Sequence, residues 1–205
     1  MPSPSPTESR RPGRPRDAGR DEAILKATLE LVSADGLPAL TVDAVAAKAG
    51  VSKATIYRRW SSKEAMLLDA WRELTVPIET PDTGSVRDDL VALYDDFARK
   101  LRGGTLARVM PHMHAAAQVD ADLGRQYRAF LAERRKPLVL MVQRAIARGE
   151  LPAGTDAEFV QELIHGPLYF RAVVIDRPVP RSHVEQLVDF ALNGLRAADA
   201  ALNPA

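Results

Sequence analysis

Two short amphipathic segments that meet at one glycine, within residues 41–60, constrain this chain more than any other stretch. The first segment has an apolar face at the i, i+3, i+4, i+7 spacing of a helix, formed by Val42, Val45, Ala46 and Ala49. Gly50 follows, and a glycine just past a helix can adopt the left-handed conformation that turns the chain. Thr41 and Ser52 stand where each helix would begin and can cap it. The sequence therefore predicts two short helices joined by a tight turn.

The second of these helices presents a cationic and hydrogen-bonding face. Ile56 and Trp60 are four residues apart and are expected to pack inward. The side chains left largely outward are Lys53, Thr55, Tyr57, Arg58 and Arg59. A short, rigidly held helix of this kind fits the major groove of DNA, with its first residues at base edges and others at phosphates. The alternative is a generic helical hairpin with a solvated basic face.

This region resembles the DNA-binding domain of the TetR (tetracycline repressor) family of bacterial transcription regulators. The resemblance covers residues 18–68 and rests on the run GVSKATIY at 50–57, followed by Trp60, Ser62, Lys63, Glu64 and Leu67. It implies that Thr41, Tyr57 and Lys63 touch phosphates, that Lys53 and Thr55 lie at base edges, and that the functional unit is a homodimer. The residues expected to contact double-stranded DNA are Arg14, Arg16, Thr41, Ser52, Lys53, Ala54, Thr55, Tyr57, Arg58, Arg59 and Lys63.

Residues 1–17 predict a disordered basic arm, since they are rich in Pro and Ser and have no apolar residue after Met1. The run RRPGRPR at 10–16 resembles an AT-hook, in which arginines lie along a narrow minor groove. An arm directly before a helix-turn-helix can reach that groove. A solubilising tail with only non-specific phosphate attraction is the open alternative.

Composition sets further limits. Of 205 residues, 46% are hydrophobic and 27% charged, as in soluble globular proteins. The chain has no apolar run long enough to span a bilayer and no signal peptide, which predicts a cytoplasmic protein with no membrane partner. The absence of cysteine excludes disulfides and thiolate metal sites. Net charge is +1, but residues 1–63 hold 11 Lys and Arg against 7 Asp and Glu, so the positive end coincides with the motif.

The remaining chain predicts an all-α fold. Helical periodicity recurs from about residue 19 to 35 and, after a capping box at Ser61 to Glu64, through residue 74. Beyond a Pro- and Gly-containing break at 76–85, helices follow to the C-terminus, and Pro137 is expected to kink or split the longest. The expected organisation is an arm at 1–17, a three-helix DNA-binding domain at 18–64, and a helical effector-binding and dimerisation domain at 65–205.

Two sets of side chains are assigned to this larger domain. Aromatic, thioether and imidazole groups on its middle helices are expected to line a pocket for a small, mostly apolar effector. These are Tyr94, Phe97, Met110, Met113, His114, Tyr127, His165 and Tyr169. Apolar stripes on the last two helices are expected to pair across a two-fold axis, as the resemblance implies. These are Leu163, Pro167, Phe170, Val184, Leu187, Val188, Ala191 and Leu195.

Other chemistries find little support in the sequence. His112 and His114 point about 200° apart on a helix, so they are not expected to share a metal ion. The chain has no glycine-rich phosphate loop and no nucleophile elbow, so neither an enzyme nor a cofactor is expected. The favoured function is a repressor released from a palindromic operator by a small molecule. The alternatives are a DNA-binding regulator without such a ligand and, less favoured, an all-α enzyme.

Overall fold

The computed structural model describes residues 18–75, 80–102 and 104–202, so the predicted arm with Arg14 and Arg16 lies outside the described residues. Every regular element within the described residues is helical, which confirms the predicted fold class. None of these helices is both long and apolar enough to cross a membrane.

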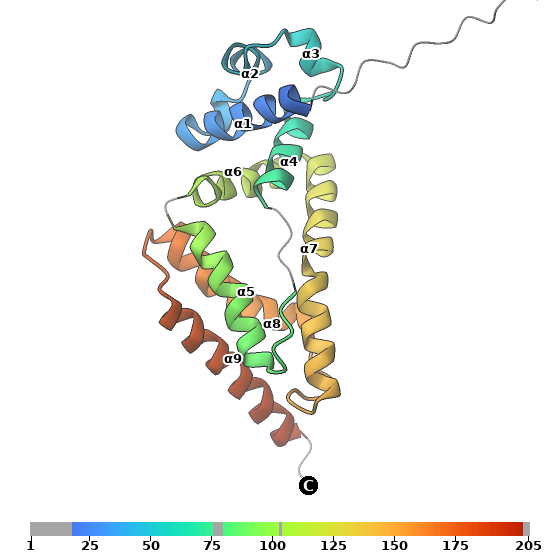
Figure 1. Ribbon diagram of the computed structural model, residues 1–205, viewed down its shortest axis with the longest axis vertical. Helices are drawn as coiled ribbons and strands as arrows, with labels where there is room; N and C mark the ends of the chain where they lie inside the picture. Colours follow the sequence, from blue (N-terminus) through green and yellow to red (C-terminus); the bar gives the residue numbers. More distant parts are fainter. Residues whose placement is uncertain (1–17, 76–79, 103, 203–205) are drawn as a thin grey trace, which may run out of the picture.

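A small unit of three helices lies at the top of Figure 1, above helices α4 and α6. Its elements are α1 (Ala18–Asp35), a 3-10 turn (Leu37–Ala39), α2 (Val42–Ala49) and α3 (Lys53–Tyr57). Helix α1 packs against both α2 and α4, burying Ile24 and Val32 completely. The first short helix of the motif, α2, is therefore held on this longer helix, and α3 packs against α2.

Helix α4 (Lys63–Leu74) connects this unit to the rest of the chain. Its N-cap is Ser62, whose Oγ accepts a hydrogen bond from the backbone N–H of Ala65 at 3.1 Å. The expected capping box at Ser61 is therefore wrong by one residue, because it is Ser62 that has the extended backbone of a cap. Lys63 lies in the first turn, as predicted.

Five further α-helices build the larger part of the molecule among the described residues. They are α5 (Val86–Leu101), α6 (Thr105–Val119), α7 (Ala121–Ala147), α8 (Ala157–Tyr169) and α9 (Arg181–Leu202). Helix α7 runs unbroken through Pro137, so of the two expected outcomes, a kink or a split, the split does not occur. Helix α8 continues past Pro167 and passes into one π-helical turn, Phe170–Val174.

Two hydrophobic cores lie one above the other. The first joins α1–α4 to α6 and the first half of α7, and the second lies among α5, α7, α8 and α9. Phe97 packs against both cores.

The predicted boundary between residues 64 and 65 falls within α4, whose Met66, Leu67 and Leu68 belong to the first core. Helix α4 is thus packed on both the three-helix unit and α6.

Candidate functional site

The turn between α2 and α3 has the geometry that its residues predict. The hydroxyl of Thr41 accepts a hydrogen bond from Ala44 N at 3.1 Å, and that of Ser52 accepts one from Thr55 N at 3.2 Å. Gly50 has a φ of 66° and a ψ of 34°, the left-handed conformation that favours glycine. Because both caps and the turn are satisfied locally, the angle between the two helices is fixed.

The inner face of α3 holds it against the body of the protein. Ile56 and Trp60 are 1% and 6% exposed, respectively. The indole N–H of Trp60 donates to Asp69 Oδ2 at 2.9 Å, and Asp69 also accepts from Arg72. Since Asp69 lies on α4, the segment that ends α3 is tied to the connecting helix.

The outer face of α3 is exposed and carries one ion pair. Tyr57 is 59% exposed, and Lys53, Ala54 and Arg58 are also exposed. Lys53 Nζ pairs with Asp43, which raises the pKa of the ammonium through that hydrogen bond. The predicted DNA-contacting side chains of residues 52–58 thus lie on or near one exposed face, and Lys63, in the first turn of α4, is exposed as well.

Arg59 is directed away from this outer face. Its Nη2 donates to Asp21 Oδ2 on α1. The guanidinium therefore joins the end of α3 to α1, and it can contact a phosphate only by leaving or sharing Asp21. No local pattern in the sequence indicates this pairing, because the two residues are 38 positions apart.

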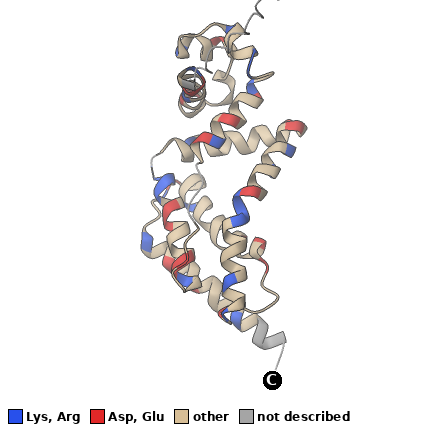
Figure 2. Ribbon diagram, turned by 45° about the vertical axis from the view of Figure 1, so that its right-hand side comes forward, with Lys and Arg blue, Asp and Glu red and all other residues tan. Residues whose placement is uncertain are grey.

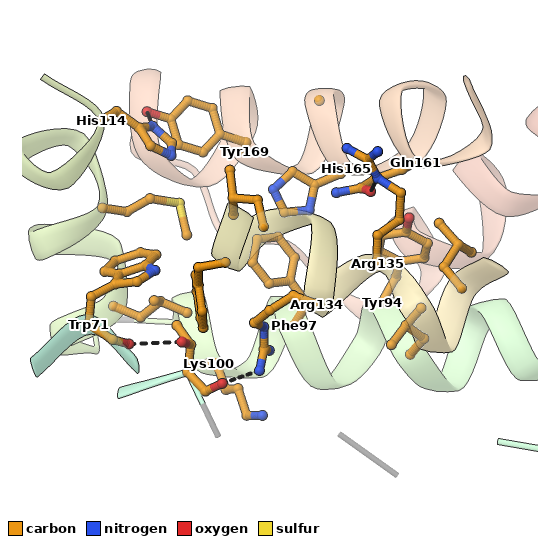
Figure 3. A pocket seen from close by; sticks show the side chains of 18 of the residues that line it. Trp71, Tyr94, Phe97, Lys100, His114, Arg134, Arg135, Gln161, His165 and Tyr169 are labelled. Carbon is orange, nitrogen blue, oxygen red and sulfur yellow. Dashed lines mark hydrogen bonds between the residues drawn. The ribbon is translucent and has the colours of Figure 1, made fainter. Parts of the chain in front are cut away.

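A cavity of about 390 Å³ lies between α4, α5, α6, α7 and α8, below the three-helix unit. Figure 3 shows side chains from these helices converging on it. The lining residues are Trp71, Thr75, Leu93, Tyr94, Phe97, Lys100, Leu106, Met110, His114, Tyr127, Phe130, Leu131, Arg134, Arg135, Leu138, Gln161, His165, Gly166 and Tyr169.

Seven of the eight side chains expected in an effector pocket line this one cavity, and Met113 does not. Met113 is wholly buried in the first core. On α6, Met110 and His114 are one turn apart and share a face, whereas Met113 is rotated by about 100° from His114. The expectation for Met113 is therefore wrong.

The two histidines in the cavity wall are held neutral. Burial lowers the pKa of His165 to about 4, with a smaller contribution from His114, and His165 stacks on Phe97 at 4.4 Å between ring centroids. Burial also lowers the pKa of His114, whose Nδ1 lies 3.3 Å from the hydroxyl of Tyr169. Neither imidazole therefore carries a charge into the cavity at neutral pH.

Comparison with known proteins decides the family. Residues 24–70 match the model for bacterial regulatory proteins of the tetR family, and residues 80–191 match that of the tetracyclin repressor-like C-terminal domain. The chain belongs to the TetR family. It is 39% identical to the HTH-type transcriptional regulator YdeS of Bacillus subtilis (strain 168) over 92% of this chain and 96% of that protein.

Two further proteins agree with this TetR-family assignment. The DNA-binding transcriptional repressor TetR of Mycobacteroides abscessus is 31% identical over 86% of this chain and 94% of its own length. The crystal structure of the TetR family transcription regulator SCO0332 superposes with a TM-score of 0.65 at 33% identity, covering 85% of this chain and 97% of that one. This protein is therefore a DNA-binding transcriptional regulator with an N-terminal helix-turn-helix.

The predicted dimer stripe of this TetR-family regulator needs a correction. Val184, Val188 and Ala191 are 0%, 0% and 4% exposed, because this side of α9 packs into the second core beside α5. They cannot meet a second chain, and Leu187 and Leu195 are partly buried beside them. Helical periodicity identified a buried face, but that face is buried within the protomer. Leu163, Pro167 and Phe170 keep some or most of their surface exposed.

Three cations of the cavity wall, Lys100, Arg134 and Arg135, were not predicted from the sequence. Charged residues on a long helix ordinarily face solvent, so none of the three stood out. One signal was present: Arg134 follows Phe130 and Leu131 by four and three residues, which puts all three on one face of α7. As for metal binding, the described residues contain no group of three or more His, Cys, Asp or Glu side chains that could hold an ion. His112 and His114 are therefore not part of such a group.

Proposed function

We propose that this TetR-family regulator is a cytoplasmic homodimeric repressor that leaves its operator when a small molecule occupies the cavity. The observation that carries the proposal is the position of α4. Its first turn carries the exposed Lys63 and follows closely on the segment that ends α3, while Trp71, and Thr75 directly after its last turn, line the cavity. At about 1.5 Å per residue, twelve residues separate the two ends by roughly 18 Å. A ligand that displaces the lower end of α4 would displace the DNA-reading unit.

The dimer is supported by exposed apolar surface. Five of the eight large apolar side chains that are exposed among the described residues lie between α8 and α9 or on them. They are Phe159, Phe170, Val174, Ile175 and Phe190. Such clustering marks an interaction surface rather than scattered exposure. Together with Leu163 and Pro167, these side chains supply the apolar surface that a second copy would cover about a two-fold axis.

The symmetry and half-site spacing of the operator can be tested without knowing the effector. Selection of bound duplexes from random DNA is expected to return a palindrome with half-site centres about 34–36 Å apart, or a multiple of that spacing, because a two-fold dimer places two reading helices in successive major grooves. Bound sequences without two-fold symmetry would contradict the dimeric reader.

Lys53 and Lys63 are expected to act differently on DNA. Lys63→Ala should weaken binding about equally on cognate and random duplexes and flatten the salt dependence by about one unit of log–log slope per subunit, since a phosphate contact carries no sequence information. Lys53→Ala should instead narrow the free-energy gap between cognate and random DNA by roughly 1–3 kcal/mol for each base that the side chain no longer reads. Titrations at several salt concentrations would test both expectations. The two roles would have to be exchanged if only Lys63→Ala reduced the discrimination between cognate and random DNA.

Asp43 is expected to restrain Lys53 in the free protein, because DNA must displace the carboxylate from the ammonium. Asp43→Asn should raise affinity for random duplexes by up to about 5-fold at low salt, the scale of one exposed ion pair, and the gain should shrink as salt is added. Glu30→Gln is the matched control, since it breaks the exposed pair with Lys48 at 2.9 Å on α1 and α2. An equal gain from both variants would mean that net charge, not the release of Lys53, is responsible.

A further inference from the structure

The cavity wall has an uneven balance of charge. Three cations line it, and no Asp or Glu is among the lining residues that the structure describes. Two of the cations have carboxylate partners outside the cavity: Lys100 pairs with Asp96 at 2.8 Å, and Arg135 pairs with Glu158 at 2.8 Å. In residues 18–75, 80–102 and 104–202, no carboxylate lies within ion-pair distance of Arg134.

Arg134 is also half-buried. Its Nη1 donates to the carbonyl oxygen of Thr75, and its guanidinium lies 5.9 Å from the ring centroid of Phe130. Burial lowers the pKa of this guanidinium, but an arginine stays protonated at neutral pH. A guanidinium has five N–H donors, and one hydrogen bond to a carbonyl leaves most of them without a partner in the described chain. Its charge is balanced there only by the longer-range attraction of Asp96, which forms its ion pairs with Arg99 and Lys100. Such a group favours a ligand anion, to which it can bind through two parallel hydrogen bonds.

A second unpartnered donor lies in the same wall. Trp71 is 2% exposed, and its indole Nε1 has no hydrogen-bond partner among the described residues. Figure 3 shows this nitrogen on the side of the ring that faces the other lining side chains. A buried N–H without an acceptor is costly. An oxygen atom of a bound ligand would satisfy it.

We propose that the cavity binds an organic monoanion, with its carboxylate or similar oxyanion on Arg134 and an oxygen acceptor at the indole N–H of Trp71. Its apolar, preferably aromatic, body lies against Phe97, Tyr127 and Met110. The cavity volume is near the lower end of the roughly 300–1,000 Å³ of ligand sites, which fits a small molecule of one or two rings. This inference rests on the proposed effector role of the cavity and narrows the expected apolar effector to an amphipathic anion.

The test uses the full-length protein and a panel of arylalkanoic acids of graded length, from phenylacetate to naphthylpropionate, each paired with its primary amide. Calorimetry is expected to show at least one acid binding about 10- to 100-fold more tightly than its amide, since the two differ in charge but little in shape. Arg134→Gln should remove this preference, and Arg134→Lys should keep part of it because the charge remains. Lys136→Gln, which alters an exposed cation paired with Glu133 on the same helix, should change nothing.

Trp71→Phe provides a variant that does not depend on Arg134. It keeps an aromatic ring but removes the indole N–H, so the favoured acid should bind about 2- to 10-fold more weakly. A panel in which no acid binds more tightly than its amide, including one in which nothing binds, contradicts the proposal. So does an acid preference that survives in a folded Arg134→Gln protein. An acid that binds through Arg134 yet leaves DNA affinity unchanged supports the anion site and contradicts effector control.

Discussion

Phe190→Asp is expected to convert the regulator into a monomer and to weaken operator binding by about 100- to 10,000-fold, the advantage that a second linked reader provides. Phe190 is 81% exposed on α9, on the side opposite the buried residues Val184 and Val188. When two copies associate, an Asp carboxylate at this position would lose its water within an apolar interface and would gain no cation in exchange. Sedimentation velocity gives the oligomeric state, and fluorescence anisotropy gives the operator affinity.

Val119→Asp is the matched control for Phe190→Asp. Val119 is 90% exposed, but it ends α6, far in sequence from the apolar face of α8 and α9. This variant should remain a dimer with unchanged operator affinity. If both variants stay dimeric, or if both dissociate, the assignment of the interface to α8 and α9 is wrong. Circular dichroism would show that Phe190→Asp keeps its helices, so that dissociation is not confused with unfolding.

A ligand that binds the cavity is expected to weaken operator affinity by about 5- to 150-fold, the usual range of coupling between two sites. Its effect must pass through a contact that differs between the bound and released forms. The hydrogen bond from Arg134 to the carbonyl of Thr75 is the clearest such contact, because it joins α7 to the end of α4 inside the cavity wall. A ligand anion competes for that same guanidinium. In Arg134→Gln, the release of DNA by a saturating concentration of the same cavity ligand should therefore be smaller than in the wild type.

The features that could be predicted from sequence are local ones. Thr41, Gly50 and Ser52 determine the turn through hydrogen bonds and backbone angles within three residues of each, and the structure shows all three as expected. Seven of the eight residues proposed for the pocket share one cavity because they are large, weakly polar groups on the inward faces of the helices that surround it.

The features that could not be predicted depend on which helix, or which second chain, packs against a given helix face. The periodicity of Val184 and Val188 shows that one side of α9 is buried, but not whether α5 or a second chain buries it. The pairing of Arg59 with Asp21 and the position of Arg134 in the cavity wall also depend on contacts between residues that are far apart in the sequence. Charged residues of both signs alternate along the lower helices in Figure 2, so sequence alone provides no reason to single out one arginine.

Occupancy of the cavity and binding of the operator are expected to oppose each other in the dimer, and the whole proposed mechanism depends on this opposition. Calorimetry of one cavity ligand with the free protein and with the protein–operator complex tests it directly. Linkage requires the operator to weaken ligand affinity by the same factor by which the ligand weakens operator affinity. We therefore predict two equal factors, each about 5- to 150-fold. A ligand that binds the cavity equally well with and without operator would contradict this mechanism.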